Sequence, residues 1–251
     1  MDSLTPCEQH VFETYLRPGM AILDLGVGGG RTTPYLSSIA SRYAGVDYSE
    51  EMTRACQSKF PHLPFTLADA ADLSQFADAS FDAVVFSFNG LDCLAPYEKR
   101  ESCLRESYRV LKPGGVYIFS THNPRSLFLD WRWDHERLRR LARKVAGAGV
   151  VFQAALAGLT CGRVALSAAR SGAKAIPRVY QRLPAAAFWR GAGYVADPST
   201  SGAHMYCGIP SRIVPEVTRL GFRSLEVVPE NYPGRIYEYS TRWYYYAFSK
   251  E

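Results

Sequence analysis

A glycine-rich stretch and an acidic residue about 20 positions later form the pattern with the clearest chemical meaning. The stretch Asp24-Leu-Gly-Val-Gly-Gly-Gly30 ends one apolar run, and Asp47 closes the next. Glycines let the backbone turn tightly and let a ligand approach closer than a Cβ would permit. The start of the following helix supplies free N–H donors for an anionic group. A carboxylate at position 47 can accept both hydroxyls of a ribose, and Met52 offers an apolar face to a purine.

The glycine spacing argues against a dinucleotide coenzyme. The dinucleotide fingerprint is G-x-G-x-x-G, so a count from Gly26 and Gly28 places the third glycine at position 31. That position is Arg31, and the spacing is G-x-G-x-G with an acid two residues before the first glycine. A single nucleoside is therefore the favoured ligand, and a purely structural glycine turn is the alternative.

A second group of polar residues follows two later apolar runs. His122 comes directly after residues 115–121, and Asn89 and Asp92 follow residues 81–88. Imidazole titrates near neutral pH, which suits a general base, while Asn89 and Asp92 can orient an acceptor. Each of the three is equally a candidate turn or cap residue. We interpret His122, Asn89 and Asp92 as candidate catalytic residues.

Alternating strands and helices position these residues. Apolar runs predict strands at 21–26, 43–47, 64–69, 81–88 and 115–121, and helices at about 5–16, 31–41, 49–60 and 97–111. A late helix at 212–222 and strands at 222–228 and 242–250 complete the pattern. Such alternation predicts right-handed βαβ units. The expected fold is α/β, a Rossmann-like, doubly wound, mostly parallel seven-stranded sheet, with ligands beyond the carboxyl ends of its strands.

Four segments in register resemble one family. DLGVGGG, GVDYSEEM, LADAADLSQFADASFDAVVFSF and RVLKPGGVYIFSTHN are similar to the motifs of class I S-adenosylmethionine-dependent methyltransferases, and the resemblance covers residues 20–123. It implies that S-adenosylmethionine is the cofactor and S-adenosylhomocysteine the product. It also implies a cofactor site in which the methionine part lies near Asp24, Gly26, Gly28 and Gly30, the ribose at Asp47 beside Tyr48 and Met52, the adenine at Asp69 and Ala70, and the sulfonium at Ser87 and Phe88.

Composition sets the broad class. The 251 residues are 47% apolar and 21% charged, which is typical of soluble globular proteins and excludes a disordered, collagen-like or coiled-coil chain. The six cysteines stand singly, so neither a zinc site nor a disulfide framework is expected, and no metal is predicted. The first residues include acids and no apolar run, so we expect no secretory signal and a cytoplasmic location.

The segment after the fifth predicted strand differs from the rest. Residues 131–183 hold eleven Arg or Lys and two acids, a net +9 in a chain of +5. We therefore divide the chain into a cofactor-binding core, 1–122 and 206–251, and a helical cap or substrate lid, 123–205. The charge has three main interpretations: a solvated face, a site for an anionic or carrier-linked acceptor, or contact with a membrane surface. Nucleic acid is disfavoured because no aromatic-studded basic groove is evident.

These features predict methyl transfer to an oxygen, or a nitrogen, of a small-molecule acceptor such as a biosynthetic or sugar-type metabolite. His204, Tyr206 and Tyr237 are the candidate substrate contacts from the later part of the chain. Two alternatives remain open at this stage. One is a cofactor-binding protein that does not methylate but catalyses a cyclisation or regulates a partner. The other is a membrane-associated lipid methyltransferase.

Overall fold

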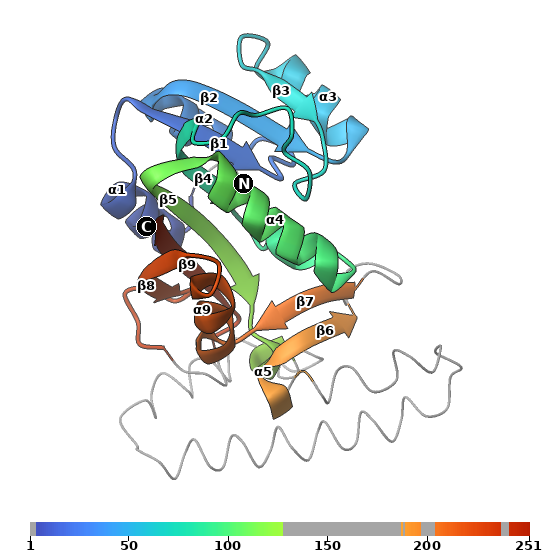
Figure 1. The fold of residues 1–251 in the computed structure, drawn as a ribbon, viewed down its shortest axis with the longest axis vertical. Coiled ribbons are helices and arrows are strands. Elements are labelled where there is room, and N and C mark those ends of the chain that lie inside the picture. Colours follow the sequence, from blue (N-terminus) through green and yellow to red (C-terminus); the bar gives the residue numbers. More distant parts are fainter. Residues whose placement is uncertain (1–3, 128–186, 188, 197–203, 237–240) are drawn as a thin grey trace, which may run out of the picture.

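The protein is built on a seven-stranded sheet with helices on both faces (Figure 1). The structure is a computed structural model that describes residues 4–127, 187, 189–196, 204–236 and 241–251. The strand order is β3-β2-β1-β4-β5-β9-β8. β9 pairs antiparallel with both of its neighbours, and the pairs from β3 to β5 are parallel. The strands are β1 (Met20–Leu25), β2 (Ala40–Asp47), β3 (Phe65–Leu67), β4 (Phe81–Phe86), β5 (Leu111–His122), β8 (Phe222–Pro229) and β9 (Trp243–Lys250).

The direction of strand addition reverses between β1 and β4. The chain moves outward from β1 through β2 to β3 and then returns to place β4 on the other side of β1. In open α/β sheets, ligands bind beyond the carboxyl ends of the strands at such a switch point. The predicted sheet is confirmed, and the glycine-rich stretch and the residues after β4 both begin at this switch point.

Two hydrophobic clusters, one on each face, hold the sheet between its helices. On β4, Ala83 and Val85 belong to one cluster, and Val84 and Phe86 belong to the other. The first cluster includes residues of α1, α2 and α3, and the second includes residues of α4 and α9, which lie on the near face in Figure 1. The helices are α1 (Pro6–Tyr15), α2 (Thr33–Ile39), α3 (Glu50–Lys59), α4 (Tyr97–Val110) and α9 (Pro210–Thr218).

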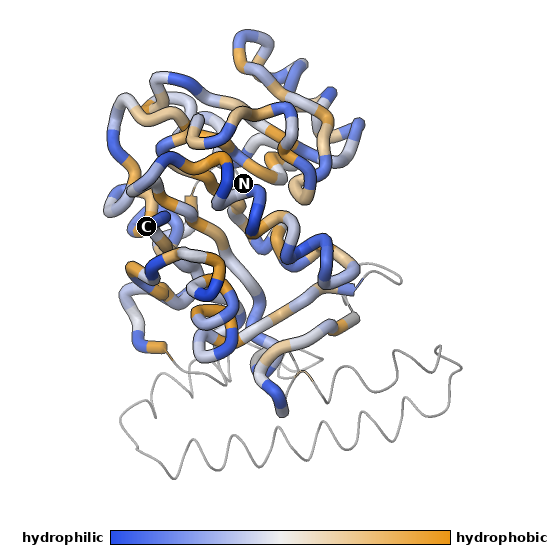
Figure 2. The backbone as a smooth tube through the Cα atoms, in the orientation of Figure 1, coloured by the Kyte–Doolittle hydropathy of each residue, from blue (hydrophilic) through white to orange (hydrophobic). Residues whose placement is uncertain are grey.

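Hydropathy along the chain follows this layering. Figure 2 shows apolar stretches along the central strands and hydrophilic stretches on α4. Strands buried on both faces read as continuous apolar runs, which is why the sequence predicts β1, β4 and β5 well. Two short helices follow strands of the sheet: the 3₁₀ helix η1 (Gly90–Cys93) after β4 and α5 (Pro124–Leu127) after β5.

A second, two-stranded sheet lies across the predicted domain boundary. β6 (Ala192–Ala196) pairs antiparallel with β7 (His204–Gly208), within the part of the chain where the sequence predicts a helical insertion and its end. The predicted boundary between 205 and 206 falls within β7, and Val195, Met205 and Cys207 form a hydrophobic cluster separate from those of the main sheet. The division into a core and a cap remains a prediction. The basic segment 131–183 lies outside the described residues. Within the described parts, no helix is both long enough and apolar enough to cross a membrane.

Candidate cofactor and acceptor site

Three glycines shape the loop between β1 and α2, for different reasons. Gly26, Gly28 and Gly30 have φ angles of 60°, 52° and 73°, a region that side chains with a Cβ rarely adopt. A Cβ on Gly26 would lie 2.5 Å from the Phe86 ring, and one on Gly30 would lie 2.6 Å from Phe60. A Cβ on Gly28 would meet nothing within 4 Å among the described atoms. Internal packing therefore requires Gly26 and Gly30, whereas Gly28 presents its backbone to open space.

Asp47 connects this loop to the end of β2. Its Oδ2 accepts a hydrogen bond from the backbone N–H of Gly28 at 2.8 Å, and its Oδ1 accepts one from the backbone N–H of Ser49 at 2.8 Å. Ser49 in turn caps α3, because its hydroxyl accepts from the backbone N–H of Met52 at 3.3 Å. An ionised carboxylate has about four acceptor positions. Asp47 is therefore held in place and can still accept two further hydrogen bonds.

Exposed apolar side chains lie close to Asp47 along the chain. Tyr48 is 77% exposed, Met52 is 42% exposed and Leu67, at the end of β3, is 51% exposed. β2 and β3 are paired, and Asp47 is the register partner of Leu67. Large apolar side chains beside a fixed carboxylate offer the surface that a purine base and its ribose require.

Asp69 and Ala70 follow β3, as the sequence predicts, and the Asp69 carboxylate already has two donors. Lys99 donates to its Oδ2 at 2.7 Å, and the backbone N–H of Ala71 donates to its Oδ1 at 2.9 Å. Burial alone would raise the pKa of Asp69, but the hydrogen bond from Lys99 and that from Ala71 lower it below its ordinary value. Ala70 itself is buried. Their contact with adenine remains a prediction.

Asp24 lies beneath the glycine loop, with its carboxylate turned into the protein. It is 1% exposed, and its Oδ2 accepts hydrogen bonds from the Thr32 hydroxyl at 3.0 Å and the Tyr43 hydroxyl at 2.9 Å. Burial raises the pKa of Asp24 to about 7, although the two hydroxyls oppose the shift. The side chain therefore ties β1 to β2 and to the start of α2, and does not face the open side where the sequence places the methionine part.

A buried network centred on Glu8 was not predicted from the sequence. The Glu8 carboxylate is 0% exposed and accepts hydrogen bonds from Arg31 at 2.6 and 2.7 Å, from Tyr245 at 2.8 Å and from Ser87. Burial alone would raise the pKa of Glu8, but the hydrogen bonds from Arg31 and then Ser87 lower it below its ordinary value. The Ser87 hydroxyl is thus bonded within the protein instead of lining an open surface. Glu8 fastens α1 over the carboxyl end of β4.

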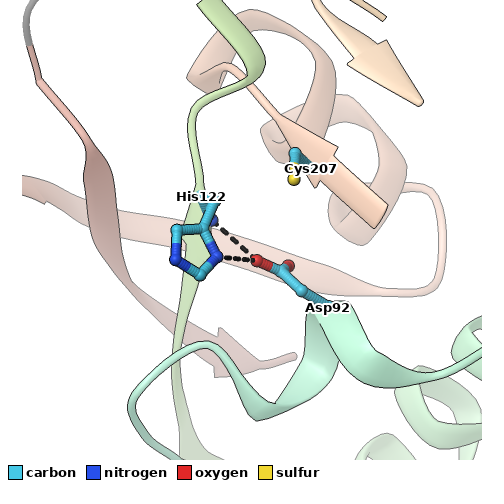
Figure 3. A group of neighbouring side chains, drawn as sticks. All are labelled: Asp92, His122 and Cys207. Carbon is cyan, nitrogen blue, oxygen red and sulfur yellow. Dashed lines mark hydrogen bonds and ion pairs between the residues drawn. The ribbon is translucent and has the colours of Figure 1, made fainter. Parts of the chain in front are cut away.

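The three candidate catalytic residues do come together, and Figure 3 shows two of them, Asp92 and His122. His122, the last residue of β5, has its Nδ1 2.9 Å from Asp92 Oδ2 and its Nε2 3.2 Å from Asn89 Nδ2. A carboxylate can only accept, so Nδ1 carries the proton. The Asn89 amide nitrogen can only donate, so Nε2 holds a lone pair. This is the tautomer that a general base requires, and the side chain is 26% exposed.

Backbone geometry and further donors hold this group in place. Phe88 and Asn89 have φ angles of 55° and 64°, a strained region for residues other than glycine that clusters at functional sites. The backbone N–H of Asn89 donates to Ser120 at 2.7 Å. Asp92 is 0% exposed and also accepts hydrogen bonds from the Thr121 hydroxyl and, at 2.7 Å, from the backbone N–H of His122. Asp92 is therefore fixed before any ligand binds.

Cys207 on β7 approaches the same pair. One ligand atom each of Asp92, His122 and Cys207 lie within 4.8 Å of one another (Figure 3), so the described residues contain one group that a metal could address. However, the Asp92 carboxylate already accepts three hydrogen bonds and lies 3.8 Å from the Arg100 guanidinium. A cation would have to displace the His122 proton beside an existing positive charge. The arrangement therefore fits an aspartate–histidine pair better than a metal centre.

The remaining predicted contacts have different surroundings. Phe88 is 60% exposed at the end of β4, with the Arg31 guanidinium 5.0 Å from its ring centre and Trp243 6.5 Å away. Tyr206 on β7 is half-buried, with its ring 5.3 Å from the Tyr97 ring and the Arg100 guanidinium 4.7 Å from its centre. His204 begins β7 and is half-buried. Tyr237 lies outside the described residues.

These features define a Rossmann-like fold with a fixed carboxylate, Asp47, and a hydrogen-bonded group of Asn89, Asp92 and His122 at the carboxyl ends of its parallel strands. Residues 23–119 match the family model described as a methyltransferase domain. Demethylmenaquinone methyltransferase of Streptomyces griseus is 35% identical over 102 residues, which cover 41% of this chain and 42% of that enzyme. The chain thus spans less than half the length of this relative. It carries a class I S-adenosylmethionine-dependent methyltransferase domain, and S-adenosylmethionine is the cofactor of that domain.

Solved structures agree with this fold over nearly the whole chain. A methyltransferase described as S-adenosylmethionine-dependent from Methanosarcina mazei has a TM-score of 0.59 at 19% identity and covers 99% of this chain and 98% of its own. The 1,6-didemethyltoxoflavin-N1-methyltransferase of Burkholderia thailandensis, with S-adenosylhomocysteine bound, has a TM-score of 0.57 at 13% identity, over 98% of this chain and 76% of its own.

The chain's own residues fit this cofactor. Gly28 leaves space above the loop backbone, and Asp47 retains acceptor positions for the two ribose hydroxyls. Tyr48, Met52 and Leu67 present exposed apolar surface, and their contact with the adenine remains a prediction. In the sequence, the candidate cofactor site is marked by the glycine-rich stretch and by the acid that ends the second strand. No feature of the sequence predicts the Glu8 network, because a glutamate in the first turn of a helix is usually a capping residue.

Proposed function

We propose that the protein transfers the methyl group of S-adenosylmethionine to an oxygen atom of a small-molecule acceptor, with His122 as the general base. The observation that carries this proposal is the His122 Nε2 lone pair, oriented by Asp92 through Nδ1 at 2.9 Å. His122 ends β5, which is parallel to β4, and the strands from β1 to β5 therefore present their carboxyl ends at one edge of the sheet. The base and Asp47 share that edge.

When bound, the cofactor supplies a methyl group that is already activated by its sulfonium. The protein's contribution is to hold the acceptor oxygen in line with that methyl and to remove its proton. Alignment of this kind can supply ~7–11 kcal/mol of the barrier. During the transfer, His122 Nε2 would accept the proton of the acceptor hydroxyl, and Asp92 would stabilise the resulting imidazolium.

Asn89 supports a polar acceptor in two ways. Its amide nitrogen faces His122 Nε2 at 3.2 Å and occupies the position that an acceptor hydroxyl would take. Its Oδ1 is buried, with no hydrogen-bond partner among the described residues, so a donor on the bound acceptor would satisfy it. A buried unsatisfied acceptor costs roughly 1–3 kcal/mol, which favours compounds that carry such a donor. A small-molecule acceptor is also what the names of the two methyltransferases above describe for those proteins.

The test is release of S-adenosylhomocysteine by the full chain in a fractionated metabolite extract, followed by identification of the methylated compound. His122→Ala should lower kcat/KM about 10²–10⁴-fold, the usual contribution of a general base, and should leave binding of S-adenosylhomocysteine unchanged. His62→Ala, at an exposed position outside the site, is the matched control and should retain full turnover.

Three outcomes contradict the proposal in whole or in part. Cofactor binding without turnover in any fraction would favour the alternative in which the protein binds S-adenosylmethionine but does not methylate. Full turnover in His122→Ala would remove His122 as the base. A product methylated on nitrogen would keep the enzyme class and the role of His122, but it would reject oxygen as the methylated atom.

A further inference from the structure

Arg100 on α4 is a completely buried cation next to the proposed catalytic pair. Its side chain is 0% exposed, and Nη1 lies 3.8 Å from Asp92 Oδ1 and donates to the backbone carbonyl of Leu91 at 3.3 Å. Nε and Nη2 donate to the two carboxylate oxygens of Glu216 on α9 at 3.1 and 3.4 Å. The Arg100 guanidinium therefore contacts η1 through Leu91 and Asp92 and links this helix to α9.

A structural ion pair alone does not account for this arrangement. Burying a charge costs several kcal/mol unless it is paired and hydrogen-bonded, and Glu216 by itself would suffice to balance Arg100. Burial alone would lower the pKa of Arg100, but the charges of Glu216 and Asp92 raise it above its ordinary value. The charged guanidinium thus lies between two buried carboxylates, those of Glu216 and Asp92. The Asp92 carboxylate also holds His122.

We propose that Arg100 is a positioning residue whose charge balances the buried Asp92 carboxylate and thereby keeps the His122 proton on Nδ1. The inference rests on the proposed function, because only a base at His122 gives the tautomer a catalytic meaning. A buried carboxyl group without a cation favours its neutral, protonated form. A protonated Asp92 would donate to Nδ1, the imidazole proton would move to Nε2, and the lone pair that accepts the acceptor's proton would be lost.

The charges around Asp92 come from three elements. Arg100 faces it from α4, His122 faces it from β5, and Glu216 lies on α9 behind Arg100. Cys207 approaches from β7. Tyr97 donates to Glu216 Oε1 at 3.0 Å, so Glu216 has a second donor that is independent of Arg100. Removal of the Glu216 charge therefore leaves Asp92 with its cation, whereas removal of the Arg100 charge does not.

The experiment compares variants on the two sides of this buried pair by ¹⁵N NMR of the full chain labelled with ¹⁵N-histidine. The His122 signals are assigned from the spectrum of His122→Ala, because the chain has five histidines. Wild type, Arg100→Lys and Glu216→Gln should all show the Nδ1–H tautomer. Arg100→Met should show the Nε2–H tautomer, with kcat/KM lowered about 100-fold or more and S-adenosylhomocysteine affinity unchanged. Glu101→Gln, in the exposed pair of the same helix, is the control that should change nothing.

A merely structural pair would behave differently. Retention of the Nδ1–H tautomer in Arg100→Met would overturn the proposal, and so would its loss in Glu216→Gln. Should Arg100→Met fail to fold, Arg100→Gln, which keeps hydrogen-bonding atoms without the charge, takes its place with the same expected tautomer. The spectra need no acceptor, so a failed methyl-transfer assay rejects the proposed function alone, and a wrong tautomer rejects the role of Arg100 alone.

Discussion

Asp24→Asn should make the stability of the protein less dependent on pH between about pH 4 and pH 7. Burial raises the pKa of Asp24 from an ordinary 3.8 to about 7 in the folded chain. A carboxyl group with a raised folded pKa binds its proton more tightly in the folded state than in the unfolded state. Its stabilising contribution is therefore complete below pH 3.8 and is lost as the pH rises through about 7.

The magnitude follows from the separation of the two pKa values. At ~1.4 kcal/mol for each pH unit, the interval from 3.8 to about 7 corresponds to roughly 4 kcal/mol of unfolding free energy. The variant cannot ionise. Its amide oxygen can still accept from both Thr32 and Tyr43, because both hydroxyls donate to the same carboxylate oxygen. The substitution thus preserves the hydrogen bonds and removes the loss of unfolding free energy that accompanies ionisation of Asp24.

Urea denaturation of the cofactor-free protein at intervals from pH 4 to pH 8 provides the measurement. The unfolding free energy of Asp24→Asn minus that of the wild type should rise by about 4 kcal/mol across this range, because the other carboxylates contribute equally to both curves. Glu51→Gln, at an exposed position, should run parallel to the wild type. A flat difference curve for Asp24→Asn would show that the buried carboxylate ionises normally, and the reasoning would fail.

Four further substitutions test the cofactor loop and the start of α3. Asp47→Asn should weaken S-adenosylhomocysteine binding about 10- to 100-fold in calorimetry, since hydrogen bonds to a charged group contribute ~1.5–3 kcal/mol; an unchanged Kd would reject its ribose role. Gly26→Ala should lower the Tm more than Gly28→Ala. Both substitutions cost roughly 1–2 kcal/mol because the backbone φ is positive, but only the Cβ at position 26 would also lie 2.5 Å from the Phe86 ring. An equal fall in Tm for the two variants would contradict this. Ser49→Ala should cost about 1 kcal/mol in denaturant unfolding through loss of the α3 cap, and no loss would show that the cap is dispensable.

Local pattern was sufficient to predict the main sheet and the position of the cofactor loop. The apolar runs that end at Asp24, Asp47 and Phe88 are strands buried on both faces, and their carboxyl ends meet wherever βαβ units are right-handed. The start of α3 is local in the same sense, because its cap, Ser49, bonds the backbone three residues further along the chain. The placement of His122 beside Asp92 follows from the adjacency of β4 and β5.

Long-range polar contacts were beyond the sequence. Glu8 and Tyr245 lie 237 positions apart, and Arg100 and Glu216 lie 116 apart, so no local spacing marks them as partners. Arg100 stands in a helix of mixed charges and reads as a solvated residue, whereas the fold buries it completely. β6 was missed because its sequence, AGYVA, is short and contains a glycine, and its strand character depends on pairing with β7.

The order of the strands also bears on how the chain is made. Ribosomes deliver residues in sequence, yet β9 occupies the gap between β5 and β8 and pairs with both. Until residues 243–250 have left the exit tunnel, the outer edge of β5 has no neighbour, and an open edge is a template for pairing with other chains. Tyr245 of that same strand also bonds Glu8 on α1. Formation of β9 therefore both covers this edge of β5 and supplies the tyrosine that holds α1.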